Sequence, residues 1–347
     1  MDNMFIYPLL VALLISYLMV PQVKRLAFSL GAVDKPNKRR INVKPIPSLG
    51  GIAIYLGVLF ALILTGFSSE FLGIIAGGTL IVILGILDDL YELSAFVKLL
   101  GQIVAGLVLI GFGTRIEFIS NPFGGIYYLG LLGVPMTLIW IVGVMNTINL
   151  IDGMDGLAGG VTVIATATLA IFAYQQGQVL TVILALSVIG ATLGFLKYNF
   201  NPAEIFMGDT GSMFLGFMLG AISIVGTLKS VTAITLLIPI LVLGVPILDT
   251  LFAILRRKLS GQPIFKADKG HLHHKLLELG LSQIQAVTII YLISIFLAMI
   301  AIGVSEADLN QLIFLTASSV GFILLGAIKL GIFNVKSNYI NDINLSN

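Results

Sequence analysis

The segment Asn146-Thr-Ile-Asn149-Leu-Ile-Asp152-Gly-Met-Asp155-Gly-Leu-Ala-Gly-Gly160 organises the chain, because it joins two apolar segments that are each long enough to cross a bilayer. Asn and Asp recur in it at a spacing of three, so several of these side chains lie near one face of a helical end. Ionisable groups close to hydrocarbon are costly and usually serve a function. The Asn and Asp side chains of this segment suit a metal ion, sugar hydroxyls or the edge of a nucleobase. A glycine-rich turn that merely connects two helices is the alternative.

The composition is that of an integral membrane protein. Of 347 residues, 58% are apolar and only 10% are charged, and the mean hydropathy is +1.06. A soluble domain carries about 25% charged residues. The long apolar runs therefore predict an all-α, polytopic membrane protein. The absence of cysteine excludes disulfides and thiolate metal sites.

Eleven transmembrane helices are predicted, and the 38 glycines suit close packing of helices in lipid. The predicted helices cover roughly residues 3–22, 49–67, 71–87, 97–113, 131–148, 157–174, 178–196, 211–228, 232–254, 284–303 and 311–333. We expect one membrane domain over residues 1–335 and a short polar tail at 336–347.

Lysine and arginine predict the orientation. With eleven spans, 17 of the 19 basic residues fall on one side of the membrane and only Arg115 and Lys229 on the other. Basic residues concentrate on the cytoplasmic side, so the N-terminus is expected outside and the C-terminus in the cytoplasm. The same count places every polar cluster on the cytoplasmic face. This arrangement favours an enzyme, because a transporter needs polar groups near the midplane. A lipid-linked sugar transporter and a non-catalytic scaffold are the alternatives from other classes.

Two acidic motifs end or begin predicted spans. Asp88 and Asp89 end the third span, where the helix dipole is also negative, so a cation or a proton would stabilise them. Lys98 begins the next span and is either a phosphate contact or a snorkelling lysine. Asp209 precedes the eighth span between two glycines, and it is either a metal ligand or a helix cap.

All three histidines, His271, His273 and His274, lie in the longest predicted cytoplasmic loop. Zinc binding is one interpretation, but the familiar third ligand is missing from the pattern. Contact with substrate phosphates is favoured because lysines and arginines surround the histidines, and contact with anionic lipid is a further alternative. Carboxylates for a divalent cation and basic groups for phosphates together indicate phosphoryl transfer. No P-loop is present, so ATP hydrolysis of that type is not expected.

Five motifs occur in the order found in one enzyme family. They are Lys44-Pro-Ile-Pro-Ser-Leu-Gly-Gly51, Leu87-Asp88-Asp89, Asn146–Gly160, Asn199–Ser212 and His271-Leu-His-His274. On these motifs the chain resembles the polyprenyl-phosphate N-acetylhexosamine-1-phosphate transferases, integral membrane enzymes related to the peptidoglycan translocase. The resemblance implies transfer of a sugar 1-phosphate from a UDP-sugar to a polyprenyl phosphate, release of UMP, and dependence on Mg²⁺ or Mn²⁺.

The resemblance also implies roles for individual residues. Asp209 and Asn149 would bind the metal, and Asp88 would deprotonate the lipid phosphate with Asp89 beside it. The implied catalytic residues are Asp88, Asp89, Asp209, His271, His273 and His274. The implied substrate contacts are Lys44, Lys98, Asn146, Asn149, Asp152, Asp155, Asn199 and Phe206.

The histidine motif indicates the sugar. Its form His-Leu-His-His at 271–274 is similar to the branch of the family that uses UDP-GlcNAc to start cell-surface glycans such as teichoic acid or O-antigen. The alternative is the peptidoglycan branch, which transfers phospho-MurNAc-pentapeptide. The resemblance further implies a bacterial plasma membrane protein with its site facing the cytoplasm and no nucleic-acid partner. A homodimer is one assembly compatible with it.

Overall fold

The computed structural model describes residues 2–34, 45–65, 68–120, 125–227, 237–259, 261, 270–305, 307 and 309–329. The predicted phosphate contact Lys44 and the predicted tail at 336–347 lie outside these residues.

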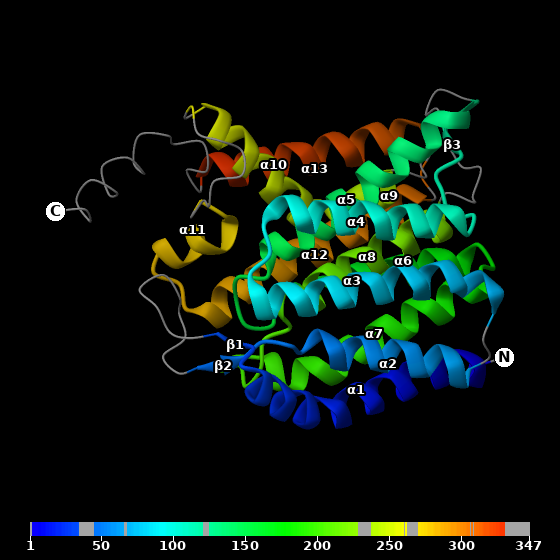
Figure 1. The fold of residues 1–347 in the computed structure, drawn as a ribbon. Coiled ribbons are helices and arrows are strands. Elements are labelled where there is room, and N and C mark those ends of the chain that lie inside the picture. Colours follow the sequence, from blue (N-terminus) through cyan, green and yellow to red (C-terminus); the bar gives the residue numbers. More distant parts are fainter. Residues whose placement is uncertain are drawn as a thin grey trace.

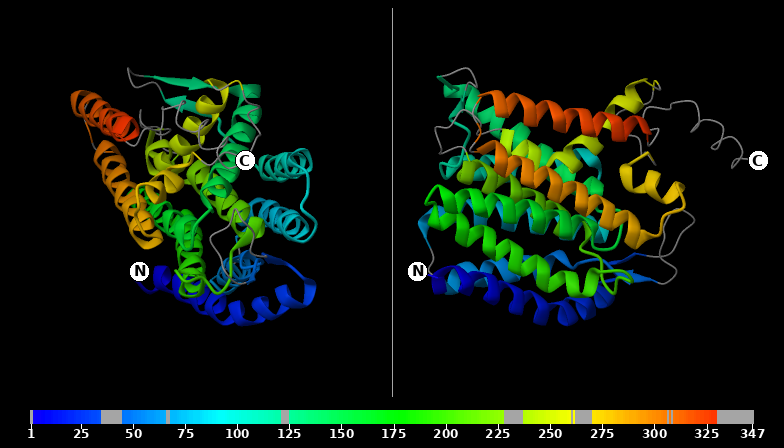
Figure 2. Two further views of the ribbon diagram at one scale, coloured as in Figure 1. Left: turned by 90° about the vertical axis from the view of Figure 1, so that its left-hand side faces the viewer. Right: turned by 180° about the vertical axis from the view of Figure 1, so that it is seen from behind.

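The protein is a bundle of long helices whose axes are roughly aligned and whose direction reverses from one long helix to the next along the chain (Figures 1 and 2). The helices are α1 (Asp2–Leu30), α2 (Gly51–Leu64), α3 (Leu72–Tyr91), α4 (Ala95–Gly111), α5 (Gly133–Ile151), α6 (Leu157–Gln175), α7 (Val179–Asn199), α8 (Gly208–Thr227), α9 (Leu237–Val242), α10 (Gly244–Leu259), α11 (Leu272–Glu278), α12 (Gln283–Ser305) and α13 (Leu309–Lys329). Two single 3₁₀ turns, Ser69–Phe71 and Gly130–Leu132, precede α3 and α5.

Two small antiparallel sheets stand at opposite ends of the bundle. Strand β1 (Val33–Asp34) pairs with β2 (Ile46–Pro47), and β3 (Phe118–Ser120) pairs with β4 (Ile126–Tyr128). The β1–β2 sheet lies at the same end as α11, whereas β3 and the N-terminus lie at the other end (Figure 1). We call the end with β1, β2 and α11 the polar end.

The fold confirms a helical, multi-pass membrane protein. Within the described part of the chain, seven helices are long and apolar enough to span a membrane, namely α1, α3, α5, α6, α7, α8 and α12. Helices α2 and α4 are apolar but shorter. A predicted span that should cover 232–254 contains two helices, α9 and α10. The count of eleven spans and the orientation of the termini stay predictions.

Helix α8 is the centre of the bundle and packs against α2, α3, α5 and α6. Its side chains Phe214, Leu215 and Phe217 are almost completely buried. At the edge, α7 lies directly against α1, because a side chain at Gly190 or Gly194 would collide with the α1 backbone. Glycines spaced by four residues allow this close approach of two helices in lipid. The packing places the first turn of α8 between the polar ends of α3 and α5.

Candidate functional site

Lys98 joins two carboxylates at the polar end of the bundle. From the first turn of α4, its Nζ donates to Oδ2 of Asp88 and to Oδ2 of Asp209, each over 2.9 Å. Asp88 is buried at the end of α3, while Asp209 in the first turn of α8 is 29% exposed. Three helices therefore bring two acids and one basic residue from three separate segments into a single cluster.

Asp88 is oriented by the end of its own helix. Its Oδ1 accepts a 2.8 Å hydrogen bond from the backbone nitrogen of Leu93, and its carbonyl accepts one from Glu92. Glu92 ends α3 in the left-handed conformation, with φ of 51°, which turns the chain back over the carboxylate. The negative end of the α3 dipole disfavours a carboxylate at this position, and the hydrogen bond from the Leu93 nitrogen offsets that effect.

Asp89 caps a neighbouring helix. Its Oδ1 accepts from the Asp209 nitrogen over 2.8 Å, and its Oδ2 accepts from the nitrogen and hydroxyl of Thr210 over 3.1 and 2.6 Å. The first N–H groups of a helix lack internal partners, and a carboxylate there also interacts favourably with the dipole. Asp89 therefore holds the start of α8, and hence Asp209, in place. Its predicted catalytic role stays a prediction.

Asn149 meets Asp209 from the last turn of α5. Its Nδ2 donates to Oδ1 of Asp209 and to the Ser212 hydroxyl, both over 2.9 Å. Asn146, one turn earlier, donates to Oε1 of the buried Gln102 over 2.7 Å. The predicted spacing of Asn residues thus produces one face of α5 that lines the cluster.

Asp152 follows directly after α5 and is half-buried. Among the described residues, none donates a hydrogen bond to its carboxylate. Burial raises the pKa of Asp152 to about 8, and the negative charges of Asp209, Asp89 and Asp155 raise it further. A cation close to Asp152 would be stabilised by the same charges.

Asp155 and Asn199 stabilise the turns beside the cluster. Oδ2 of Asp155 accepts from the Asn201 amide and the Ala203 nitrogen, each over 3.0 Å. Asn199 is buried, accepts from the Gly156 nitrogen over 3.0 Å and donates to the Ile205 carbonyl over 2.9 Å. Both residues lie beside the site as predicted, and their described contacts are to the protein itself.

The backbone of Phe206, just before α8, forms hydrogen bonds with the segment that precedes α2. Its backbone nitrogen donates to Pro47 over 2.9 Å, and its carbonyl accepts from Gly50 over 2.9 Å. This short parallel pairing is centred on Ser48 and Phe206. The conformation brings the motif that follows Lys44 to the polar end, although Lys44 itself is outside the described residues.

The three histidines approach the same region from α11. His273 is buried and packs on Gly153, next to Asp152. Its ring stacks on His271 at 5.8 Å between centroids and lies 4.2 Å from His274. Burial lowers the pKa of His273 to about 3, and the neighbouring His274 and His271 contribute. The His273 ring is therefore uncharged at neutral pH.

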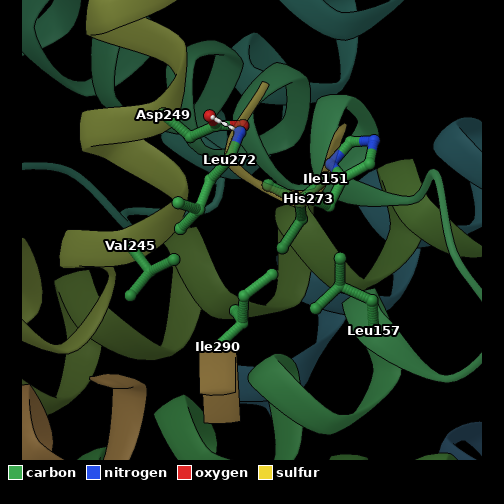
Figure 3. A pocket seen from close by; sticks show the side chains of 7 residues that line it. All are labelled: Ile151, Leu157, Val245, Asp249, Leu272, His273 and Ile290. Atoms are coloured by element: carbon green, nitrogen blue, oxygen red, sulfur yellow. Dashed lines mark hydrogen bonds between the residues drawn. The ribbon is translucent and has the colours of Figure 1, made fainter. Parts of the chain in front are cut away.

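A small apolar cavity lies where α11 packs on the bundle (Figure 3). It is lined by Ile151, Leu157, Val245, Asp249, Leu272, His273 and Ile290. Asp249 was not among the residues predicted from sequence, yet it contacts His271 through its Oδ2, 2.8 Å from Nδ1. It is the only charged residue in the predicted span 232–254, and that rarity could have identified it. Tyr291, whose hydroxyl donates to the Gly156 carbonyl over 2.6 Å, carries no comparable signal.

The donor set at the cluster fits a hard divalent cation. Asp209, Asn149 and Asp152 offer oxygen ligands, and the carboxylates of Asp88 and Asp209 share the ammonium group of Lys98. In the described part of the chain, no group of three or more His, Asp or Glu side chains is arranged to hold a metal by itself. Mg²⁺ does not require such a group, because it is usually bound by one or two carboxylates, water and substrate phosphates.

Comparison with known proteins gives consistent matches. Residues 71–227 match the model of glycosyl transferase family 4. A Bacillus subtilis (strain 168) protein named "Probable undecaprenyl-phosphate N-acetylglucosaminyl 1-phosphate transferase" is 44% identical over 94% of this chain and 92% of its own length. A decaprenyl-phosphate N-acetylglucosaminephosphotransferase of Mycolicibacterium smegmatis is 34% identical, over 86% and 80%. A phospho-N-acetylmuramoyl-pentapeptide-transferase of Shouchella clausii is 31% identical, over 84% and 93%.

Proposed function

Since this chain belongs to glycosyl transferase family 4, we propose that it transfers N-acetylglucosamine 1-phosphate from UDP-GlcNAc to a polyprenyl phosphate and releases UMP. The net reaction forms a bond between a lipid phosphate oxygen and the sugar-bound phosphorus, and it breaks the bond from that phosphorus to UMP. The names of the Bacillus and Mycolicibacterium relatives support both the polyprenyl phosphate acceptor and the N-acetylglucosamine donor.

The observation that carries this proposal is the position of Lys98 between Asp88 and Asp209. Phosphoryl transfer depends mainly on positioning and on neutralising charge. An ammonium group held by two carboxylates can shift its hydrogen bonds to an incoming phosphate without leaving the cluster. The cluster lies at the end of an apolar bundle, where the phosphate of a membrane-embedded lipid would be found.

Asp209 and Asn149 are the residues that would hold Mg²⁺ or Mn²⁺, with Asp152 nearby. When bound, the cation supplies neutralisation of phosphate charge. Asp88 is the proposed base that accepts the proton of the lipid phosphate, because its Oδ2 shares the Lys98 ammonium group that we expect to bind that phosphate and so lies within reach of it. The histidines of α11 are the proposed contacts for the substrate phosphates.

The proposed setting is the bacterial plasma membrane, with eleven spans, the N-terminus outside and the polar end in the cytoplasm. Figure 1 supports this arrangement, because α11 and the β1–β2 sheet share one end, and β3, which follows α4 near Arg115, lies at the other. UDP-sugars are cytoplasmic substrates, so the site has to open to that side.

Purified protein, a polyprenyl phosphate and a panel of UDP-sugars with Mg²⁺ test the function through the UMP that is released. We expect release with UDP-GlcNAc and a lipid product that carries the sugar. Use of UDP-MurNAc-pentapeptide without use of UDP-GlcNAc would instead place the protein with the Shouchella relative. Absence of UMP with every donor would contradict the transferase function.

A further inference from the structure

Asp249 in α10 and His271, the residue directly before α11, form a buried pair. Asp249 is 7% exposed and His271 is 6% exposed. Oδ2 of Asp249 lies 2.8 Å from Nδ1 of His271, and Oδ1 accepts a 2.8 Å hydrogen bond from the backbone nitrogen of Leu272. Figure 3 shows the Asp249 carboxylate directed at that nitrogen. The two carboxylate oxygens of Asp249 therefore contact two consecutive residues, His271 and Leu272.

This pairing determines which nitrogen of His271 carries hydrogen. A carboxylate only accepts hydrogen bonds, so the hydrogen between the two groups belongs to Nδ1. The remaining nitrogen, Nε2, then carries the lone pair of the neutral ring. No described residue forms a hydrogen bond with Nε2. Free imidazole in water has no such restriction, because solvent can satisfy either nitrogen.

The pair also fixes where the ring lies. His271 is the residue that precedes the first turn of α11, in an extended conformation, and the Leu272 nitrogen is one of the N–H groups that a helix leaves without an internal partner. Asp249 satisfies that nitrogen and anchors the ring with the same carboxylate. His271 in turn stacks on His273, which packs on Gly153 beside Asp152. The His271 ring is therefore held beside His273, which itself lies over the turn that follows α5.

We infer that Asp249 is a positioning residue for His271, which it holds in the Nδ1–H form so that Nε2 faces the substrate phosphates. This inference rests on the proposed function for its consequence in catalysis, but the tautomer itself does not depend on that function. Removal of a carboxylate that orients a metal-binding histidine commonly costs about 10- to 100-fold in activity, and we expect an effect of that order for a histidine that binds phosphate.

Asp249→Asn is a sharp test, because the geometry dictates how the new amide must lie. The Leu272 nitrogen can only donate, so the amide oxygen takes the place of Oδ1. The amide NH₂ then faces Nδ1 of His271 and converts that nitrogen into an acceptor. The variant should keep the backbone bond of α11 and should force the hydrogen of His271 onto Nε2.

The tautomer is measured by ¹⁵N NMR of histidine-labelled protein in lipid nanodiscs. The chain has only three histidines, and a His271→Gln variant assigns the signal. We expect the Nδ1–H pattern for His271 in the unchanged protein and the Nε2–H pattern in Asp249→Asn. A signal of His271 that is the same in both proteins would overturn the inference.

Turnover supplies the second readout. We expect Asp249→Asn to lower kcat by about 10-fold or more, Asp249→Glu to recover part of it, and Asp249→Asn to add little in a His271→Gln background. Glu278→Gln is the matched control, because Glu278 is an exposed acid of α11 that pairs with Lys275. A loss in Asp249→Asn no greater than in Glu278→Gln would also overturn the inference.

Failure of the proposed function is recognised separately. If the unchanged protein releases no UMP from any UDP-sugar, the transferase function is wrong, and the His271 tautomer alone decides the positioning role. If Asp249→Asn does not fold, as judged by gel filtration in detergent, the Nδ1–H or Nε2–H pattern in the unchanged protein decides it.

Discussion

Lys98 of α4 contacts acidic residues of two other helices, α3 and α8. Its ammonium group lies 2.9 Å from a carboxylate oxygen of α3 and 2.9 Å from one of α8. Two carboxylates share this one ammonium group, so it neutralises them only in part, and this suits a divalent cation. Asp209 is the acid that also receives a hydrogen bond from Asn149, so its charge is the one most directly shared among the site residues.

The change Asp209→Asn keeps the size of the side chain and removes its charge. We expect UMP release to fall by about 100-fold or more, because loss of one preorganised electrostatic group has an effect of that order. Glu204→Gln is the control, since Glu204 is an exposed acid near the site that pairs only with Lys24 among the described residues. Turnover like that of the unchanged protein at low Mg²⁺ would show that Asp209 is merely a helix cap.

His273 predicts a pH dependence of stability. Its pKa is about 3 in the folded protein, against about 6.5 when unfolded, so the unfolded chain binds the proton first. Stability should be complete above pH 6.5 and should decline as the pH falls toward 3. At pH 5 the loss would be about 2 kcal/mol, at about 1.4 kcal/mol per pH unit.

Thermal unfolding in detergent between about pH 7.5 and 5 measures this effect. His273→Asn should be less stable at neutral pH, because it loses packing against Gly153, but its midpoint should change less with pH. Equal slopes for the two proteins would assign the acid sensitivity to other groups.

At the scale of elements, the start of α8 is the most constrained junction in the molecule. Asp89 of α3 caps its first turn with three hydrogen bonds. Gly51 of α2 touches Gly211, and neither residue has room for a side chain. Gly208 has a positive φ of 68° and lies against the Asp89 carboxylate. The position of Asp209 therefore depends on the packing of neighbouring helices as well as on its own sequence motif.

Gly208→Ala should lower both the thermal midpoint and UMP release. The positive φ costs an alanine about 1 to 2 kcal/mol, and the added methyl group would also displace the Asp89 carboxylate. Gly280→Ala is the matched control, because Gly280 also has a positive φ, of 84°, but has nothing within 4 Å of the added carbon. If the two variants lose the same stability and activity, the contact with Asp89 does not matter.

At the scale of the whole molecule, the two ends of the bundle differ in chemistry. The end with α11 contains the acids, Lys98 and the histidines, whereas the opposite end presents the β3–β4 hairpin with its exposed tyrosines Tyr127 and Tyr128. Aromatic residues of this kind are typical of a membrane interface. Because the predicted spans put 17 of the 19 basic residues on the side of the polar end, that end should face the cytoplasm and the hairpin should face outward.

The chain has no cysteine, so single cysteines can report this orientation. In intact cells a membrane-impermeant maleimide should label Tyr128→Cys but not Glu278→Cys, and permeabilised cells should be labelled at both. The two sites are comparably accessible, at 79% and 58% exposure. The reverse pattern would invert the proposed topology. A reporter fused after Asn347 should independently behave as cytoplasmic.

The sequence by itself determined the helical, multi-pass character of the chain and singled out most of the residues that meet at the polar end. Apolar runs of membrane-spanning length predict where helices form, and the alternation of their connections places the acidic, amide and histidine motifs at one end. Asp88, Lys98, Asn149 and Asp209 could be singled out because charged and amide groups beside hydrocarbon are rare.

Only the tertiary structure decided how these residues are paired. Lys98 binds acids from two other helices, Asp89 caps α8, and Asp249 meets His271 across the α10–α11 connection. Each pair joins two different helices or segments, over 10 residues of chain for Lys98 and Asp88 and over 120 for Asp89 and the Asp209 nitrogen, and its geometry depends on the rotation and spacing of packed helices. Local sequence patterns describe one helix at a time, so they do not contain that information.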